Sequence, residues 1–392
     1  MQNFVQYTPT EVVFGREVEQ STGKEAKKWG GHNVLLVYGG GSVVKSGLLA
    51  RIEQSLTDEG ISYQEIGGVK PNPRLSLVEE GVKKGIEIKA DMVIAVGGGS
   101  AIDSAKGMAH GIANPDLNLW DIWTGQVTLE KSIPVGVVLT IAAAGSEMSN
   151  SAVLTNEKLG KKKGLSTDLN RPKFAIMNPE LTYTLPKYQL SCGIADIMMH
   201  TLERYFTQIG GNQLTDEIAE GLLRTVTENG AKAYENQTDY DSMSELMWCS
   251  SVSHNGLTGL GRQKAFPVHK IGHELSAKYD IAHGASLTAV WEAWALCSYE
   301  AATLRFARYA TKVWGIEGQD EKETALEGIH RTVDYFKSLH LPVSIGELEC
   351  GILREEELKE MARSAMGGAD VMSQCKEYCT DDIYEIFKKA NC

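Results

Sequence analysis

The feature that most constrains the fold is a strand, a glycine turn and a helix, which follow one another twice in the first half of the chain. The run VLLVYG at 34–39 leads into GGS and an amphipathic segment, and MVIAVG at 92–97 leads into GGS and AIDSAKGMAHGI. Two more short apolar runs, at 135–140 and 174–179, end in turn-forming residues. This alternation predicts a parallel sheet with crossover helices.

The pattern changes after TLP at 184–186. From about Gln189 onward the apolar residues recur at helical spacing, as in LTDEIAEGLLRTVTENGAKAY, and β-branched runs disappear. A chain of 392 residues is also too long for one ordinary core. We therefore expect an α/β, Rossmann-like domain over residues 1–188 and an all-helical domain over residues 189–392.

Net charge, hydropathy and cysteine content indicate which partners and which cellular compartment suit this chain. The net charge is −12 and no basic run is longer than GKKKG at 160–164, which argues against nucleic acid or an anionic membrane as the main partner. No apolar run approaches the ~20 residues that span a bilayer. Seven scattered cysteines indicate reduced thiols and a cytoplasmic location. Of these, Cys375 and Cys379 are expected to be surface thiols rather than metal ligands.

Each glycine turn follows a strand and opens a helix, where free N–H groups and the helix dipole favour a phosphate. A tight turn needs glycine for its own geometry, so either copy alone fits both uses. Neither copy matches G-x-G-x-x-G. In the second copy, Asp103 fits either a charge that complements the helix dipole or a hydrogen-bond partner of the nicotinamide or ribose. The first copy has no carboxylate to bind a ribose 2′-hydroxyl, which favours NADP over NAD.

Carboxylate and imidazole groups cluster in the helical half. Asp196 and His200 are four residues apart, and FPVHKIGHELSAKYDIAHG contains His269, His273 and His283. Oxygen and nitrogen ligands of this kind suit a divalent ion such as Fe²⁺ or Zn²⁺. Helical periodicity does not choose between His269 and His273 as ligands. GHELSA is not H-E-x-x-H, which argues against a zinc protease. A metal beside a nicotinamide suggests hydride transfer to or from a polarised carbonyl.

In order along the chain, several segments resemble the iron-containing (group III) alcohol dehydrogenases, most closely their butanol-dehydrogenase-like, NADP(H)-dependent branch. These segments are FVQYTPTEVVFG, PNP at 71–73, GGGSAIDSAKG, NPELTYTLP, GIADIMMHTLERYF, HNGLTGLG and HKIGHELSAKYDIAHG. The resemblance implies a dehydroquinate-synthase-like fold and a homodimer. It also implies an oxidoreductase of small to medium alcohols or aldehydes, such as butanol and butanal.

The resemblance also implies roles for single residues. His273 would face substrate and cofactor and relay a proton. The ligands of one divalent ion, Fe²⁺ or Zn²⁺ with Mn²⁺ also tolerated, would be Asp196, His200, His269 and His283. The cofactor, NADP with NAD as the alternative, would contact Gly39, Gly40, Gly41, Ser42, Asn72, Gly97, Gly98, Gly99, Ser100, Asp103, Thr140, Lys162 and Leu181. Lys161 and Lys163 flank Lys162, and each of the three also fits a solvated surface charge.

One loop departs from the family pattern. Ala143 stands in place of a glycine, and Ala144 in place of a threonine whose hydroxyl would contact the cofactor. We expect dinucleotide binding to survive with altered hydrogen bonding. Two other hypotheses stay open: an NAD-dependent glycerol or polyol dehydrogenase, or a lyase, of the same superfamily, and a nucleotide-sensing protein with a structural metal.

Overall fold

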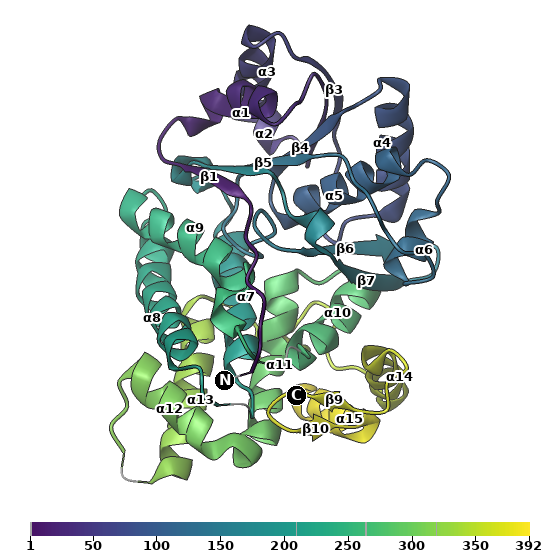
Figure 1. Cartoon of the computed structure of the whole chain (residues 1–392). Coiled ribbons are helices and arrows are strands. Elements are labelled where there is room, and N and C mark those ends of the chain that lie inside the picture. The colour runs from purple at the N-terminus through teal and green to yellow at the C-terminus, as the bar shows by residue number, and fades with distance from the viewer. Residues whose placement is uncertain (1, 209, 263–264, 319) are drawn as a thin grey trace. The chain divides into compact units, whose positions relative to one another are not determined.

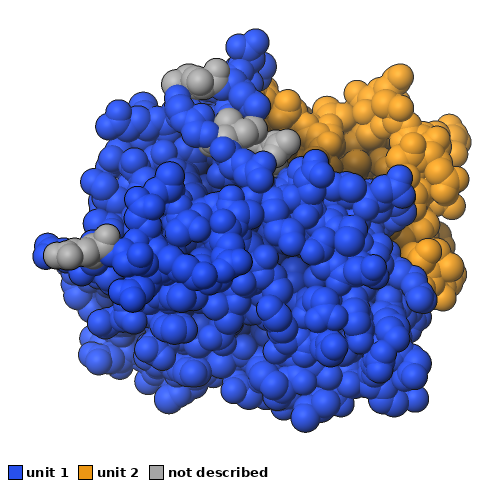
Figure 2. Space-filling view, turned by 90° about the horizontal axis from the view of Figure 1, so that it is seen from below, with its two compact units in different colours: residues 1–6, 185–392 blue, residues 7–184 orange. Residues whose placement is uncertain are grey.

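A computed structural model describes residues 2–208, 210–262, 265–318 and 320–392 of the chain. The chain divides into two compact units, residues 7–184 and residues 1–6 with 185–392 (Figure 2). The division thus falls at Leu185, four residues before the expected start of the helical domain. The N-terminal residues join the helical unit because Gln2 and Phe4 lie against Gly261.

The α/β unit is built on one parallel sheet with strand order β1-β8-β5-β4-β2-β3. Its strands are β1 (Glu11–Phe14), β2 (Asn33–Tyr38), β3 (Ser62–Ile66), β4 (Met92–Gly97), β5 (Val135–Leu139) and β8 (Phe174–Met177). The four apolar runs are therefore strands, which confirms the predicted parallel sheet. The two strands that were not predicted lie at the sheet edges, where a polar sequence such as SYQEI is tolerated.

Helices cover both faces of this sheet (Figure 1). On one face, Leu36, Ile94 and Val138 pack against Ile52 and Leu56 of α3 in a fully buried cluster. The other face is covered by α4 and α5, and β4 is consequently buried along its whole length. The helices are α1 (Thr22–Lys28), α2 (Ser42–Lys45), α3 (Leu48–Asp58), α4 (Leu75–Glu87), α5 (Gly99–Ala113) and α6 (Leu119–Trp123).

An antiparallel hairpin, which the sequence did not reveal, follows β5. It consists of β6 (Ser151–Asn156) and β7 (Lys161–Ser166), so the lysine run lies on a strand. Short 3₁₀ turns complete the unit, and these are η1 (Val18–Ser21), η2 (Asp168–Asn170) and η3 (Pro179–Thr182).

The second unit is helical and is organised around α7 (Lys187–Tyr205). Every residue of α7 from Leu190 to Tyr205 is buried, as expected of a helix with neighbours on all sides. The other helices are α8 (Gln213–Glu235), α9 (Tyr240–His254), α10 (Pro267–Tyr279), α11 (His283–Ser298), α12 (Thr303–Trp314), α13 (Glu321–Ser338), α14 (Glu355–Met366) and α15 (Thr380–Ala390). Smaller elements are η4 (Leu257–Gly259), η5 (Tyr299–Ala302), η6 (Ile345–Glu347) and a hairpin of β9 (Met372–Ser373) and β10 (Glu377–Tyr378).

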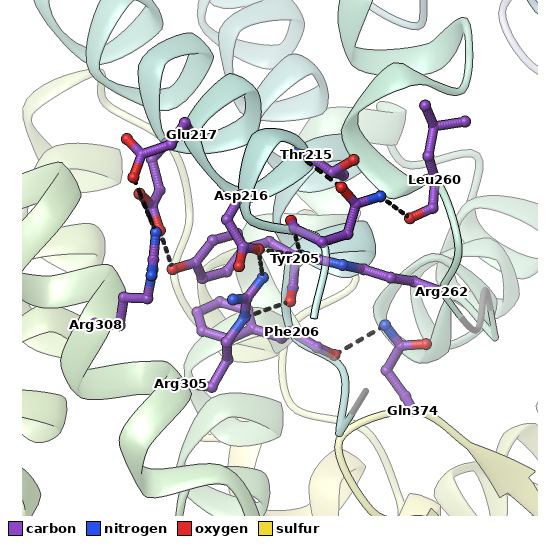
Figure 3. Close-up of polar contacts among 12 residues, drawn as sticks. Tyr205, Phe206, Thr215, Asp216, Glu217, Leu260, Arg262, Arg305, Arg308 and Gln374 are labelled. Atoms are coloured by element: carbon purple, nitrogen blue, oxygen red, sulfur yellow. Dashed lines mark hydrogen bonds and ion pairs between the residues drawn. The ribbon is translucent and has the colours of Figure 1, made fainter. Parts of the chain in front are cut away.

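A partly buried ionic network joins the C-terminal end of α7 to α8, α12 and the segment before α10 (Figure 3). The Asp216 carboxylate accepts hydrogen bonds from Arg262 and Arg305. Glu220 pairs with Arg308 through Nε at 2.6 Å and accepts a hydrogen bond from the Tyr205 hydroxyl at 2.6 Å. These charges are each balanced by a partner, which is the condition for burying them without a large penalty.

Among the described residues, no helix is both long and apolar enough to cross a membrane. All seven cysteines are free thiols. Cys379 is exposed as expected, but the expectation is wrong for Cys375, which is buried with its Sγ 3.1 Å from the Tyr378 hydroxyl.

Candidate active site: metal centre and cofactor residues

The four proposed metal ligands come together in the helical unit. Asp196 and His200 lie one turn apart on α7, His269 lies in the first turn of α10, and His283 begins α11. Three imidazole nitrogens surround Asp196 Oδ1, with His200 Nδ1 at 3.0 Å and the Nε2 atoms of His269 and His283 both at 3.7 Å. Asp196, His200 and His269 alone already have the mutual spacing of ligands to one ion.

The polar atoms of this cluster fit a bound cation. Asp196 Oδ1 and His269 Nε2 are buried, yet within the described part of the chain neither makes a hydrogen bond of ordinary geometry. Buried polar atoms in proteins are nearly always satisfied, and a carboxylate with converging imidazoles is a typical donor set for Zn²⁺ or Fe²⁺. The side chain of His283 is 27% exposed, whereas that of Asp196 is 5% exposed, so one side of the cluster is open.

Hydrogen bonds at the Nδ1 atoms of His200 and His269 orient both rings. His200 Nδ1 lies 2.9 Å from the backbone oxygen of Asp196, and His269 Nδ1 contacts the Glu203 carboxylate. Because these oxygens only accept hydrogen bonds, Nδ1 is the donor in each ring. For His269 this leaves Nε2, which lies toward Asp196 Oδ1, as the atom that a metal would use.

The electrostatics of the cluster favour a positive charge at its centre. Burial by itself would raise the pKa of Asp196, but the imidazoles of His200 and His283 hold it well below its usual range. Burial also opposes charge on His269, yet the carboxylates of Glu203 and Asp196 raise the pKa of its imidazole to about 9. A cation at this position would take the place of that proton.

His273 is placed differently from the four proposed ligands. It lies one turn beyond His269 on α10, and its ring centroid is 6.2 Å from that of His269 and 5.2 Å from that of His283. His273 is half-buried, whereas His269 is buried. The tertiary structure therefore distinguishes two histidines that helical periodicity alone left equivalent.

Two residues of the site were missed by the sequence reasoning. His254, at the end of α9, packs edge-on against His200 with ring centroids 4.1 Å apart. Burial and the nearby His200 and Arg204 hold the pKa of His254 well below its usual range, so its ring is neutral. The other residue is Glu203. Glu203 lies seven residues after Asp196, on the same face of α7. This spacing is the sequence feature that could have identified Glu203.

In the α/β unit, the two glycine turns lie at the carboxyl ends of adjacent strands. Gly39–Ser42 follow β2 and lead into α2, while Gly97–Ser100 end β4 and begin α5. The strand that follows β2 in the chain, β3, pairs with one edge of this strand pair, and the strand that follows β4, β5, pairs with the opposite edge. The strand order therefore reverses between β2 and β4. Such a reversal is where open α/β sheets bind ligands. Gly98 is also sterically required, because a Cβ there would lie 2.1 Å from Ile141 Cγ2.

Two predicted cofactor residues from distant segments are in direct contact. Lys162 Nζ lies 3.0 Å from Asn72 Oδ1, and Asn72 has a positive φ of 56°. Lys161 and Lys163 are exposed, whereas Lys162 is half-buried. The structure therefore singles out Lys162 among the three lysines.

The remaining predicted cofactor residues differ in their surroundings. The Thr140 amide donates to the Gly97 oxygen at 3.1 Å, and Ala144 lies where it would contact a side chain at Gly99. Asp103 is engaged internally, accepting from Ser146 Oγ at 2.6 Å and from the Val153 amide at 2.9 Å. Asp103 thus links α5 to β6 and to the loop before it, a structural role that differs from both roles expected from the sequence. Leu181 packs on the core cluster of the α3 face.

Comparison with known proteins agrees with this geometry. Residues 9–179 match the iron-containing alcohol dehydrogenase family, and residues 191–391 match the C-terminal part of the Fe-containing alcohol dehydrogenases. The chain is 39% identical over 393 residues to NADH-dependent butanol dehydrogenase A of Clostridium acetobutylicum, with 100% of both covered. It is 33% identical over 349 residues to the NADPH-dependent aldehyde reductase YqhD of Escherichia coli, covering 88% of this chain and 89% of the relative.

Among solved structures, the NADH-dependent butanol dehydrogenase A of Thermotoga maritima superposes with a TM-score of 0.95 at 38% identity. That match covers 100% of this chain and 99% of the other. A crystal structure of Escherichia coli YqhD superposes with a TM-score of 0.93 at 30% identity, with coverage of 100% and 99%.

Proposed function

The chain belongs to the iron-containing alcohol dehydrogenase family, and we propose that it is an NADP(H)-dependent enzyme that works mainly as a reductase of small and medium aldehydes such as butanal. As a family member it is an oxidoreductase that interconverts alcohols and carbonyl compounds with a nicotinamide cofactor. The observation that carries the proposal is the convergence of three imidazoles on Asp196 Oδ1, with His283 leaving one side open.

Each part of the reaction has candidate residues. A divalent cation held by Asp196, His200, His269 and His283 would supply Lewis-acid polarisation of the carbonyl oxygen. We assign His273 the transfer of a proton to that oxygen, because it is half-buried beside the cluster. The Gly39–Ser42 and Gly97–Ser100 turns, with Asn72 and Lys162, would hold the dinucleotide.

The preference for NADP rests on the first glycine turn. Gly39, Gly40, Gly41 and Ser42 present no carboxylate, and a 2′-phosphate there would meet backbone N–H groups and a hydroxyl. Lys45 adds a positive charge near this turn, because its Cε lies 3.6 Å from the position that a Cβ on Gly41 would occupy. Relatives carry both NADH and NADPH in their names, so this assignment is made from the residues alone.

We also propose that the enzyme is a cytoplasmic homodimer. The N-terminal segment supports dimerisation, because Phe4, Val5 and Tyr7, which precede the edge strand β1 in the sequence, are 46%, 90% and 51% exposed. Seven unpaired cysteines support a reducing compartment. Light scattering after gel filtration measures the subunit number, and a monomer would refute the dimer.

The test of the function is oxidation of NADPH and of NADH across a panel of aldehydes, with the metal content measured on the same sample. We expect turnover of straight-chain aldehydes with NADPH preferred, and one divalent ion per chain. Turnover of glycerol or dihydroxyacetone with NAD(H) alone would favour a polyol dehydrogenase instead. Bound NADP and metal without turnover of any aldehyde would indicate a nucleotide-sensing protein.

A further inference from the structure

Glu203 is fully buried, and within the described part of the chain its carboxylate accepts hydrogen bonds from the first turn of α10. It lies on α7, seven residues after Asp196 and three after His200. Its Oε1 accepts from the Val268 amide at 2.6 Å, and its Oε2 accepts from the His269 amide at 3.2 Å and from His269 Nδ1. One side chain thus caps the start of a helix and holds an imidazole of that same helix.

The cap is needed because α10 does not provide its own. The residue before the helix, Phe266, has a left-handed conformation with φ 55° and makes no side-chain cap. The first N–H groups of a helix need acceptors, and a carboxylate there also complements the helix dipole. Glu203 therefore fixes the position of the first turn of α10, and that turn carries His269.

Gln374, in the C-terminal part of the chain, also connects the end of α7 to the segment that enters α10. The Gln374 amide nitrogen donates to the backbone oxygen of Glu203. It also donates to the backbone oxygen of Phe206 at 3.0 Å (Figure 3). Its Oε1 accepts from the Ala265 amide at 3.0 Å. Because Gln374 is buried and bonded on both sides, the end of α7 and the entry to α10 cannot shift independently.

We propose that Glu203 is a positioning residue of the metal centre, which holds the His269 imidazole with Nδ1 protonated and Nε2 turned toward Asp196. The Glu203 carboxylate, the His269 ring and the ion would form a carboxylate–histidine–metal series of the kind that orients ligands in metalloenzymes. This inference rests on the proposed function, because it takes His269 to be a ligand.

The substitution Glu203→Gln tests the proposal with almost no change in size. The two oxygens of Glu203 face only donors, so an amide in their place sets its NH₂ group against at least one N–H group. With the NH₂ group at the Oε2 position, His269 Nδ1 must lose its proton to Nε2, the nitrogen that coordination requires. We expect metal affinity, measured by competition with a chelator, to fall about 10- to 100-fold.

Glu220→Gln is the matched control. Glu220 is also a fully buried glutamate of this unit, but its contacts are Tyr205 and Arg308 rather than His269. This variant should lose thermal stability while it keeps the wild-type metal affinity. If both variants lost affinity equally, Glu203 would have only a general structural role and the proposal would be overturned.

A second measurement does not need the metal. In metal-free protein labelled with ¹⁵N-histidine and held above pH 9, where the His269 ring is neutral, the His269 signals, assigned through His269→Ala, should report protonated Nδ1 in the wild type and a shift toward protonated Nε2 in Glu203→Gln. An unchanged tautomer overturns the positioning role. If the wild type binds no metal but the tautomer shifts, the proposed metal centre fails while the orienting role of Glu203 stands.

Discussion

Lys162 and Asn72, ninety residues apart in sequence, are joined by a hydrogen bond of 3.0 Å between Nζ and Oδ1. The bond connects the β6–β7 hairpin to the loop before α4, at a residue with positive φ. Their contact places an ammonium group and an amide together in the unit that holds both glycine turns. An anionic cofactor in that unit would gain a charge-assisted hydrogen bond from Lys162.

Replacing Lys162 with methionine should therefore weaken cofactor binding. Loss of a hydrogen bond to a charged group costs roughly 1.5–3 kcal/mol, so we expect the KM for NADPH to rise about 10- to 100-fold. Steady-state kinetics with Lys163→Met, which changes an exposed neighbour, provides the control. Equal effects in the two variants would mean that Lys162 has no special place in the site.

The cofactor preference should depend in part on Lys45, whose side chain lies near Gly41. Lys45 is exposed, and an exposed ion pair contributes no more than about 1 kcal/mol of binding free energy. We therefore expect Lys45→Met to raise the KM for NADPH by only about three- to fivefold. The KM for NADH should stay unchanged in the same variant. A parallel rise for both cofactors would contradict a contact with the 2′-phosphate.

The two histidines one turn apart on α10 should respond differently to removal. His269→Ala should lose the metal itself. His273→Ala should keep the metal and lose turnover by about 10²- to 10⁴-fold, the range of a general acid or base. Elemental analysis and aldehyde reduction on the same samples separate the two effects, and equal metal loss would refute the division of roles.

The stability of the helical unit should depend strongly on Asp216. Asp216→Asn leaves the guanidinium groups of Arg262 and Arg305 without their carboxylate, and the Arg262 side chain is only 1% exposed. Breaking a buried pair costs about 3–5 kcal/mol. The neighbouring Glu217→Gln alters a 46% exposed group and should change stability by less than about 1 kcal/mol. Denaturant unfolding monitored by hydrogen exchange in α8 measures both.

Acid should destabilise the α/β unit through His110. Its ring is buried between Ser132 Oγ at 2.8 Å and Asn170 Oδ1 at 2.7 Å, and burial lowers its pKa to about 4. From about pH 6.5 down to about 4 the unfolded chain binds a proton that the folded chain does not. The free energy of unfolding should fall by about 3 kcal/mol across that window.

His110→Gln cannot titrate and should lose this part of the pH dependence. Hydrogen exchange of the β4 amides at several pH values, converted to free energies of opening, measures the slope in both proteins. Identical slopes would show that another group is responsible.

Local sequence was sufficient for much of the architecture. Apolar runs that end in glycine or other turn-forming residues predicted the four inner strands, and the spacing of Asp196 and His200 predicted two groups on one helical face. These features depend on neighbours within a few residues, which periodicity reports directly. The family resemblance then added the ligand and cofactor assignments, and these remain predictions.

Other features depended on contacts between distant segments. The edge strands are short or polar, since β1 (EVVF) has only three consecutive apolar residues and β3 (SYQEI) has none, and each pairs with one described strand. The choice of Lys162, the packing of His254 on His200 and the orientation of His269 by Glu203 all join segments from separate elements. A sequence shows which face of a helix is buried, but only the tertiary structure decides which faces meet, because that depends on packing across the whole unit.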